Sequence, residues 1–175
     1  FTVEDYSYMR LEYNLRMALA GVLNTQKSSI AFIDGHGDLN MYNTAWIGSQ
    51  LGVNLQYYYN VTRDSINGRI NSLRKIAVAD TLQGTVKDLG NKYDVLIIAQ
   101  PTRPYSDKDK YAIDQHIMRG GKVMWLIDGT NAAMDSLQYC PEFMALPAQL
   151  RLTDMFFKYG VRVNSNLIQD IGSCQ

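Results

Sequence analysis

Residues 93–128 restrict the fold of this chain most, because they predict a strand, a helix and a second strand in direct succession. Val95 to Ala99 are uniformly apolar, as in a parallel strand that is buried on both faces. Ser106 is a good N-cap with Asp109 at the capping-box position, and the Gly120-Gly121 pair ends the predicted helix. The segment KVMWLIDGTN then predicts another buried strand that runs into a polar loop.

The same alternation continues toward the amino end of the chain. Residues 3–24 predict a helix whose apolar stripe consists of Leu11, Leu15, Ala18, Leu19 and Val22. Ile30 to Ile33 predict a short buried strand that ends before Gly35. Residues 42–52 predict a helix that ends at Gly52. Residues 54–62, which include three consecutive tyrosines, predict a second strand, because aromatic side chains suit a pleated, half-buried surface.

Two further segments complete the pattern. Residues 64–80 leave the assignment open, since part of them could form a helix but Gly68 and two asparagines oppose a continuous one. Residues 152–160 predict a helix that ends at Gly160, and a short strand follows from Val161. Alternating strands and helices predict an α/β fold with three layers, in which helices cover both faces of a mostly parallel sheet.

Length and charge exclude several classes of protein. The chain has 175 residues, enough for one domain with a real core, and we expect a single domain over residues 1–175. Its 17 basic and 17 acidic residues give no electrostatic footprint for nucleic acid or an anionic membrane. No apolar stretch reaches the roughly 18 residues of a transmembrane helix. The chain starts at Phe1, so we expect a fragment of a longer protein whose membrane segments lie elsewhere.

The candidate binding face lies where the predicted parallel strands end. In an open parallel sheet, ligands bind beyond the carboxyl ends of the strands. The loops expected there are residues 34–40, 100–105 and 128–131. Their candidate binding residues are Asp34, Gly35, His36, Gly37, Asp38, Arg103, Asp128, Gly129 and Thr130.

The segment Asp34-Gly-His36-Gly-Asp38 allows two interpretations. Histidine and carboxylate together suit a metal ion or proton transfer. A closed metal site needs more ligands, however, and the other histidine, His116, lies on the predicted helix away from this loop. The sequence favours a glycine-permitted turn whose polar side chains bond to backbone and water. We therefore predict neither a metal nor a cofactor.

Other kinds of chemistry find less support. The GHG segment does not continue as G-x-G-x-x-G, and the carboxylate of Asp38 would repel a phosphate. No G-x-S-x-G elbow is present, and Cys140 and Cys174 lack CxxC spacing, so no catalytic nucleophile is predicted. Arg103 stands in a loop stiffened by Pro101 and Pro104 and could present its guanidinium to a carboxylate, a sugar or a partner protein. A surface arginine bonded to neighbouring backbone is the alternative.

Three stretches are distinctive in their order and spacing: IAFIDGHGDLN, the segment from YDVLIIAQPTRPYS to KVMWLIDG, and LTDMFFKYGVRVNSNLIQD. Together they resemble the extracytoplasmic domain of the gliding-motility-associated ABC transporter auxiliary proteins. In that family a strand ends in Gly-His-Gly-acid, and a later strand ends in a proline before a helix that closes on Gly-Gly. This sequence has Asp38 where the family more usually carries glutamate, which keeps the charge.

The resemblance implies a flavodoxin-like or class I glutamine-amidotransferase-like fold without the catalytic cysteine of the amidotransferases. It also implies a periplasmic domain of an inner-membrane-anchored protein, in a Gram-negative bacterium of the Bacteroidetes. The expected role is a non-enzymatic binding or auxiliary component of an ABC transporter associated with gliding motility or export. Its partners would be the membrane and ATPase subunits or other envelope proteins, with a sugar or another small molecule as a possible ligand. Two alternatives remain: a hydrolase or amidotransferase-like enzyme that uses His36 with Asp34 or Asp38, and a structural spacer.

Overall fold

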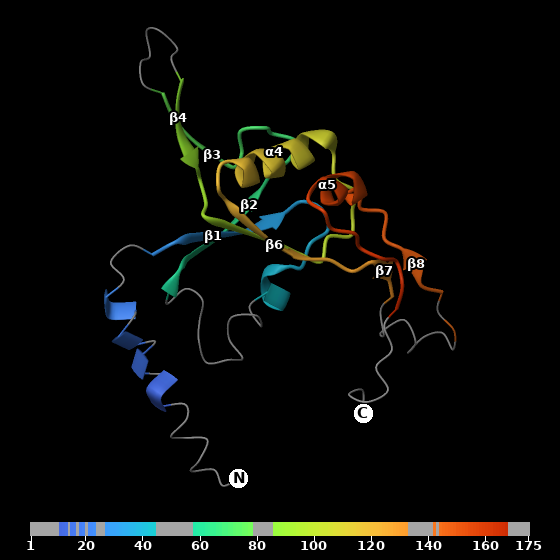
Figure 1. Ribbon diagram of the computed structural model, residues 1–175, viewed down its shortest axis with the longest axis horizontal. Helices are drawn as coiled ribbons and strands as arrows, with labels where there is room; N and C mark the ends of the chain where they lie inside the picture. The colour runs from blue at the N-terminus through green and yellow to red at the C-terminus, as the bar shows by residue number, and fades with distance from the viewer. Residues whose placement is uncertain are drawn as a thin grey trace.

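The computed structural model gives the fold of the chain (Figure 1). The residues that it describes are 11–13, 15–16, 18–19, 21–23, 27–44, 58–78, 86–132, 142 and 144–167. Among them, no helix combines the length and the apolar character needed to cross a bilayer.

A sheet of four parallel strands forms the centre of the molecule. Its strands are β1 (Ser29–Asp34), β2 (Asn60–Ser65), β5 (Val95–Ala99) and β6 (Lys122–Leu126). Their order across the sheet is β2-β1-β5-β6, and every neighbouring pair is parallel. The carboxyl ends of β1, β5 and β6 therefore lie next to one another at one edge of the sheet.

The remaining elements surround this sheet. Two helices are labelled in Figure 1, α4 (Asp107–Met118) and α5 (Thr153–Lys158). Two antiparallel pairs stand outside the central sheet: β3 (Arg74–Val78) with β4 (Val86–Asn91), and β7 (Thr130–Asn131) with β8 (Leu146–Pro147). Both α4 and α5 cover one face of the sheet, and a helical turn at residues 41–44 lies on the opposite side (Figure 1). The arrangement is a three-layer α/β fold.

Alternation along β1 and β5 divides the apolar side chains between the two faces of the sheet. On the helical face, buried side chains from the sheet, the helices and the loops form one cluster: Ala31, Ile33, Ile66, Leu73, Tyr93, Leu96, Ile98, Tyr105, Ala112, Ile113, Leu150, Leu152, Met155 and Phe156. On the other face, Ile30, Phe32 and Ile97 form a smaller cluster. The larger cluster is what fixes α4 and α5 on the sheet.

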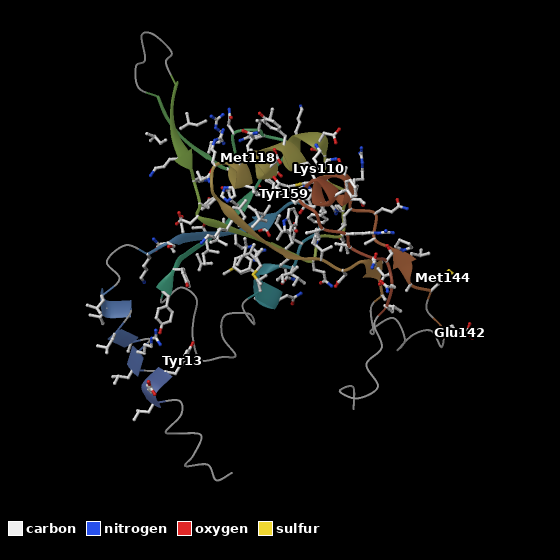
Figure 2. The ribbon with its side chains drawn as sticks, in the orientation of Figure 1. Tyr13, Lys110, Met118, Glu142, Met144 and Tyr159 are labelled. Atoms are coloured by element: carbon white, nitrogen blue, oxygen red, sulfur yellow. The ribbon has the colours of Figure 1, made fainter. Side chains whose placement is uncertain are left out.

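Polar contacts join α4 to α5 on the outside of this core. Lys110 of α4 has its Nζ 2.8 Å from Oδ2 of Asp154, at the start of α5. Tyr159, directly after α5, donates a hydrogen bond to Oδ1 of Asp114 at 2.6 Å. Figure 2 shows Lys110 and Tyr159 together in this region. Because exposed ion pairs contribute little, we assign most of the stability of this contact to the apolar core beneath it.

The structure confirms the strands at Ile30–Ile33 and Val95–Ala99 and the helix after Ser106. The side chain of Ser106 accepts a hydrogen bond from the backbone N–H of Asp109, as the capping signal predicts. Gly120 then ends the helical segment at φ +84°, a left-handed conformation that favours glycine. In the predicted amino-terminal helix, the described residues between 11 and 23 are helical, and the side chains of its leucines are exposed.

Several sequence predictions were wrong in part. The second strand begins at Asn60 rather than residue 54 and continues to Ser65, and Tyr58 and Tyr59 precede it. The segment 64–80, which the sequence left open, contains a turn and β3 in its described part, and Asn67 and Gly68 in that turn take positive φ angles, +48° and +68°. Residues 161–167 form no strand with any described residue.

The strand at residues 122–126 was predicted to be buried, and it lies instead at the edge of the sheet. Met124 is 51% exposed as a result. The predicted helix at 42–52 is described only at its start, and Gly52, Cys140 and Cys174 lie outside the described residues. The finer choice between a flavodoxin-like and an amidotransferase-like fold stays a prediction.

The buried His116 makes the stability of the domain sensitive to acid. Burial lowers the pKa of His116 below its ordinary 6.5, and a backbone contact at Lys122 and the charge of Asp94 oppose the shift only in part. The unfolded chain therefore takes up a proton near pH 6.5 that the native state does not, and stability falls as the pH drops below that value. Between pH 6.5 and 5, a His116→Leu variant should lose up to about 2 kcal/mol less stability than the unmodified chain.

Urea unfolding of both proteins at several pH values measures this difference. Carboxylates titrate equally in the two proteins, so they cancel in the comparison. Parallel pH profiles for the variant and the unmodified chain would contradict the assignment.

Candidate functional site

The candidate site is the edge of the sheet where β1, β5 and β6 end. We call it the carboxyl-edge face and define it by the loops 34–40, 100–105 and 128–130. Backbone hydrogen bonds hold these loops against one another: Leu39 N–H donates to the carbonyl of Ala99 at 3.0 Å, and Gln100 N–H donates to that of Leu126 at 2.8 Å. The three segments that the sequence placed here are thus adjacent.

The turn after β1 is locked to the loop after β5. The carbonyl of His36 accepts hydrogen bonds from Thr102 N–H at 2.9 Å and from Arg103 N–H at 2.7 Å. The hydroxyl of Thr102 donates to the carbonyl of Gly37 at 3.2 Å. A Cβ on Gly37 would lie 2.0 Å from that hydroxyl, and its φ is +74°, so this position requires glycine.

The ring of His36 points inward instead of toward solvent. The residue is only 7% exposed, and its ring stacks on Tyr105 with centroids 3.7 Å apart and an interplanar angle of 12°. Its Nε2 lies 3.3 Å from Oδ2 of Asp109, the second residue of the capping box at the start of α4. His36 therefore joins the turn after β1 to this helix.

Asp109 collects hydrogen bonds from three separate segments. Its carboxylate accepts from the Ser106 hydroxyl at 2.6 Å, from Gly68 N–H at 2.9 Å and from the ring of His36. Burial alone would raise the pKa of Asp109, but the hydrogen bonds from Ser106, Gly68 and His36 outweigh it and lower the pKa. The side chain is thus an ionised acceptor at neutral pH.

The ionised carboxylate of Asp109 determines which nitrogen of the His36 ring donates a hydrogen bond. Because an ionised carboxylate only accepts, we infer that Nε2 of His36 carries the proton in this hydrogen bond. Nδ1 of His36, Oδ1 of Asp38 and the hydroxyl of Tyr105 are buried without a hydrogen-bond partner among the described residues. Burial raises the pKa values of Asp38 and of Tyr105. These contacts suit a packed turn more than a base that reaches a substrate.

The carboxylates of Asp34 and Asp38, on either side of His36 in the sequence, bond to groups other than the His36 ring. Asp38 accepts a hydrogen bond from the backbone N–H of His36 at 2.9 Å. Asp34 pairs with both Nε and Nη2 of Arg63, the first at 2.8 Å. Arg63 also donates to the Thr44 hydroxyl at 2.7 Å and to the carbonyl of Leu39 at 2.8 Å. Neither carboxylate bonds to the His36 ring.

Arg103 is the free cation of this face. Arg103 is exposed, and within the described part of the chain its guanidinium has no hydrogen bond or ion pair. Its backbone N–H is held by His36, and its Cγ would touch a Cβ on Gly37 at 3.5 Å. The side chain therefore projects from a fixed backbone.

The loop after β6 is tied to the face through Gln100. The amide of Gln100 donates to Oδ2 of Asp128 at 2.7 Å, and Gln100 itself takes a positive φ of +51°. Gly129 packs against the carbonyl of Asn164, which a Cβ would approach to 2.4 Å. Thr130 pairs with Pro147 in the β7–β8 ribbon. A cavity of about 60 Å³ lies here, lined by Asp128 and Gly129 among others.

Sequence reasoning placed the three loops at one edge but missed the residue that organises them. It used Asp109 only as a helix cap, and nothing in the chain links that position to His36, 73 residues away. It also missed Tyr105 and Arg63. His116 lies apart from this face, with its ring against Gly121, as expected. No group of three or more potential ligands in the described residues is arranged to hold a metal ion.

Removal of the Asp109 carboxylate should destabilise the domain. An Asp109→Ala variant leaves Ser106, Gly68 and His36 without their acceptor, and we expect a loss of about 2–4 kcal/mol. Because the pKa of Asp109 is lowered, this contribution is present above pH 3.8 and is lost as the pH falls through the folded pKa. Chemical unfolding at pH 7 and at pH 3 measures it.

Asp107→Ala is the matched control for that measurement. Asp107 lies in the same helical turn, but its side chain is 81% exposed. We expect a change within about 0.5 kcal/mol for this control. Equal losses in the two variants would show that Asp109 acts only through the charge of the first turn.

Comparison with known proteins gives the family. A family model described as ABC-type uncharacterized transport system matches residues 27–175, which include strands β1 to β8 and helices α4 and α5 of the described residues. Searches of curated proteins and of solved structures returned no match. The matched region covers most of the chain and the whole carboxyl-edge face, and the chain therefore belongs to the family of ABC-type uncharacterized transport system proteins as an auxiliary component.

Proposed function

We propose that this chain is a non-enzymatic, extracytoplasmic binding domain of an ABC transport system and that its carboxyl-edge face docks a partner subunit. Membership of the auxiliary family supports the link to transport. The periplasmic location, the anchor in the inner membrane and a role in gliding motility or export rest on the sequence resemblance described above. The partners would be the membrane and ATPase subunits or other envelope proteins.

The presentation of Arg103 carries this proposal. An arginine whose backbone is fixed by two loops loses little entropy when its side chain binds a carboxylate. Arginine and tyrosine are also enriched among the residues that dominate binding energy at protein interfaces. In the helical turn directly after the first loop, Met41 is 71% exposed and Tyr42 is 84% exposed. The face thus offers a free cation, and the turn that follows its first loop adds Tyr42 as an exposed aromatic side chain.

The shape of the face favours a protein over a small molecule. A small-molecule site is a concave pocket of roughly 300–1,000 Å³. The cavity beside Asp128 measures about 60 Å³, so a sugar-sized ligand would have to open it. A protein partner could bind the exposed face without any opening of this cavity. We therefore rank a protein partner ahead of a sugar or another small molecule.

The geometry gives less support to an enzyme. A hydrolase that used His36 would need its ring within reach of a substrate and oriented by Asp34 or Asp38. The ring is instead buried against Tyr105 and bonded to Asp109, and Asp34 is paired with Arg63. These contacts support a structural role for His36.

Co-purification from cells tests the docking face. The full-length protein, co-expressed with the membrane and ATPase subunits of its transport system, should retain those subunits through affinity purification. Arg103→Glu and Tyr42→Ala should each weaken retention by about 30-fold, as expected for residues that dominate an interface, and Arg103→Lys should have a smaller effect.

Lys108→Glu provides the charge-matched control, because Lys108 is an exposed residue of α4 outside the face. Unfolding midpoints of all variants should match that of the unmodified protein, which separates binding from folding. Full retention of the subunits by Arg103→Glu would contradict the proposed face.

A further inference from the structure

The ribbon of β3 and β4 stands apart from the rest of the domain. It projects away from the central sheet, with its base beside α4 (Figure 1). The pairing register shifts between Arg74 and Ile76, and Gly90 on the opposite strand takes a φ of +98°. A bulge of this kind bends a ribbon and increases its twist. The irregularity therefore lies where the ribbon leaves the body of the domain.

Both outer edges of this ribbon are open within the described part of the chain. β3 and β4 pair with each other, and neither pairs with another described strand. An isolated two-stranded ribbon is at best marginally stable in water. An unpaired strand edge is also a ready template for another strand. Both edges of the ribbon are thus open among the described residues, and pairing with a further strand would stabilise it.

The side chains of β3 and of the turn before it are both apolar and cationic. Ile70 is 44% exposed, and Ile76 is 39% exposed. Arg69 and Lys75 are exposed, and neither side chain has a hydrogen bond or an ion pair among the described residues. We call these four residues, Arg69, Ile70, Lys75 and Ile76, the arm patch.

Basic residues outnumber acidic ones around the arm patch, although Asp88 pairs with Ile76 across the ribbon. The described side chains of residues 66–76 and 89–92 include four cations, Arg69, Arg74, Lys75 and Lys92, and no acidic residue. The chain as a whole has no net charge. Of these four, Lys92 is neutralised by Asp64 at 2.7 Å, and Arg74 also has partners. The charges of Arg69 and Lys75 are those that remain without a partner in the described part of the chain. The local excess of positive charge therefore points to an anionic partner.

We propose that the β3 edge is a docking arm that adds an extended, acidic segment of a partner protein as a third strand. Backbone hydrogen bonds along the open edge would supply the affinity. Because Lys75 and Ile76 are consecutive in the strand, they point to opposite faces of the ribbon. A segment that alternates acidic and apolar residues matches this pattern. The lipid core of a membrane fits less well, since it cannot satisfy the open backbone groups.

Binding of a synthetic peptide to the purified chain tests the arm. The probe is a short, capped peptide of alternating glutamate and valine, and its counterpart of alternating lysine and valine is the control. Amide NMR shifts locate the contact, and fluorescence polarisation gives the dissociation constant. We expect shifts that concentrate on residues 74–78, with affinity that falls as salt is added.

Charge-reversal variants separate the arm from the rest of the surface. The double variant Arg69→Glu/Lys75→Glu should bind the glutamate peptide roughly tenfold more weakly, whereas Lys108→Glu/Lys158→Glu should bind as the unmodified chain does. Arg103→Glu should also leave this binding unchanged, so failure of the arm and failure of the carboxyl-edge face are distinguishable. Matching unfolding curves for all variants exclude misfolding.

Three results would overturn the docking arm. They are the absence of saturable binding at millimolar peptide, equal binding of the lysine peptide, and an equal loss of affinity in the two double variants. Sedimentation with phosphatidylserine-containing vesicles provides the remaining test. Vesicle binding that the arm variant abolishes, without peptide binding, would reassign the patch to a membrane surface.

Discussion

The carboxylate of Asp109 is the contact on which the geometry of the carboxyl edge depends. It is buried, and it accepts hydrogen bonds from the start of α4, from the turn after β2 and from the ring of His36. An acceptor shared by three segments fixes their separation, and each donor would be left buried without a partner if the carboxylate were lost. One side chain thus relates two loops and a helix that are far apart in the sequence.

The position of Arg103 follows from this contact. Because Asp109 and Tyr105 hold the His36 ring, the carbonyl of His36 is in place to accept both Thr102 N–H and Arg103 N–H. The two glycines beside His36 let the turn adopt its positive φ angles, and Gly37 leaves room for the Thr102 hydroxyl. His36, which the sequence places between two aspartates, therefore helps to fix the backbone of the exposed Arg103.

Elements with a strong local signal could be predicted from the sequence. The apolar runs of β1 and β5 are buried on both faces, and the start of α4 is marked by its own capping residues. The loops of the candidate site could be placed as well, because parallel strands bring their carboxyl ends to one edge. These features depend on residues that are neighbours in the chain.

Features that depend on distant residues could not be predicted. The role of Asp109 needs His36 and Gly68, which are 73 and 41 positions away. β6 has the apolar composition of a buried strand, but its exposure is set by its place at the edge of the sheet. Val161 and Val163 alternate as in a strand, yet no described strand lies in position to pair with them.

Amide hydrogen exchange in the unmodified chain and in Asp109→Asn tests the central role of this carboxylate most directly. The substitution replaces one of the two carboxylate oxygens with an amide group that donates, so the side chain cannot accept from Ser106, His36 and Gly68 at both positions at once. We expect the N–H groups of Gly68, Thr102 and Arg103 to be protected in the unmodified chain and to lose protection together in the variant, while the N–H groups of β5 stay protected. Unchanged protection of Thr102 and Arg103 in the variant would contradict the account and would show that the two loops hold each other without Asp109.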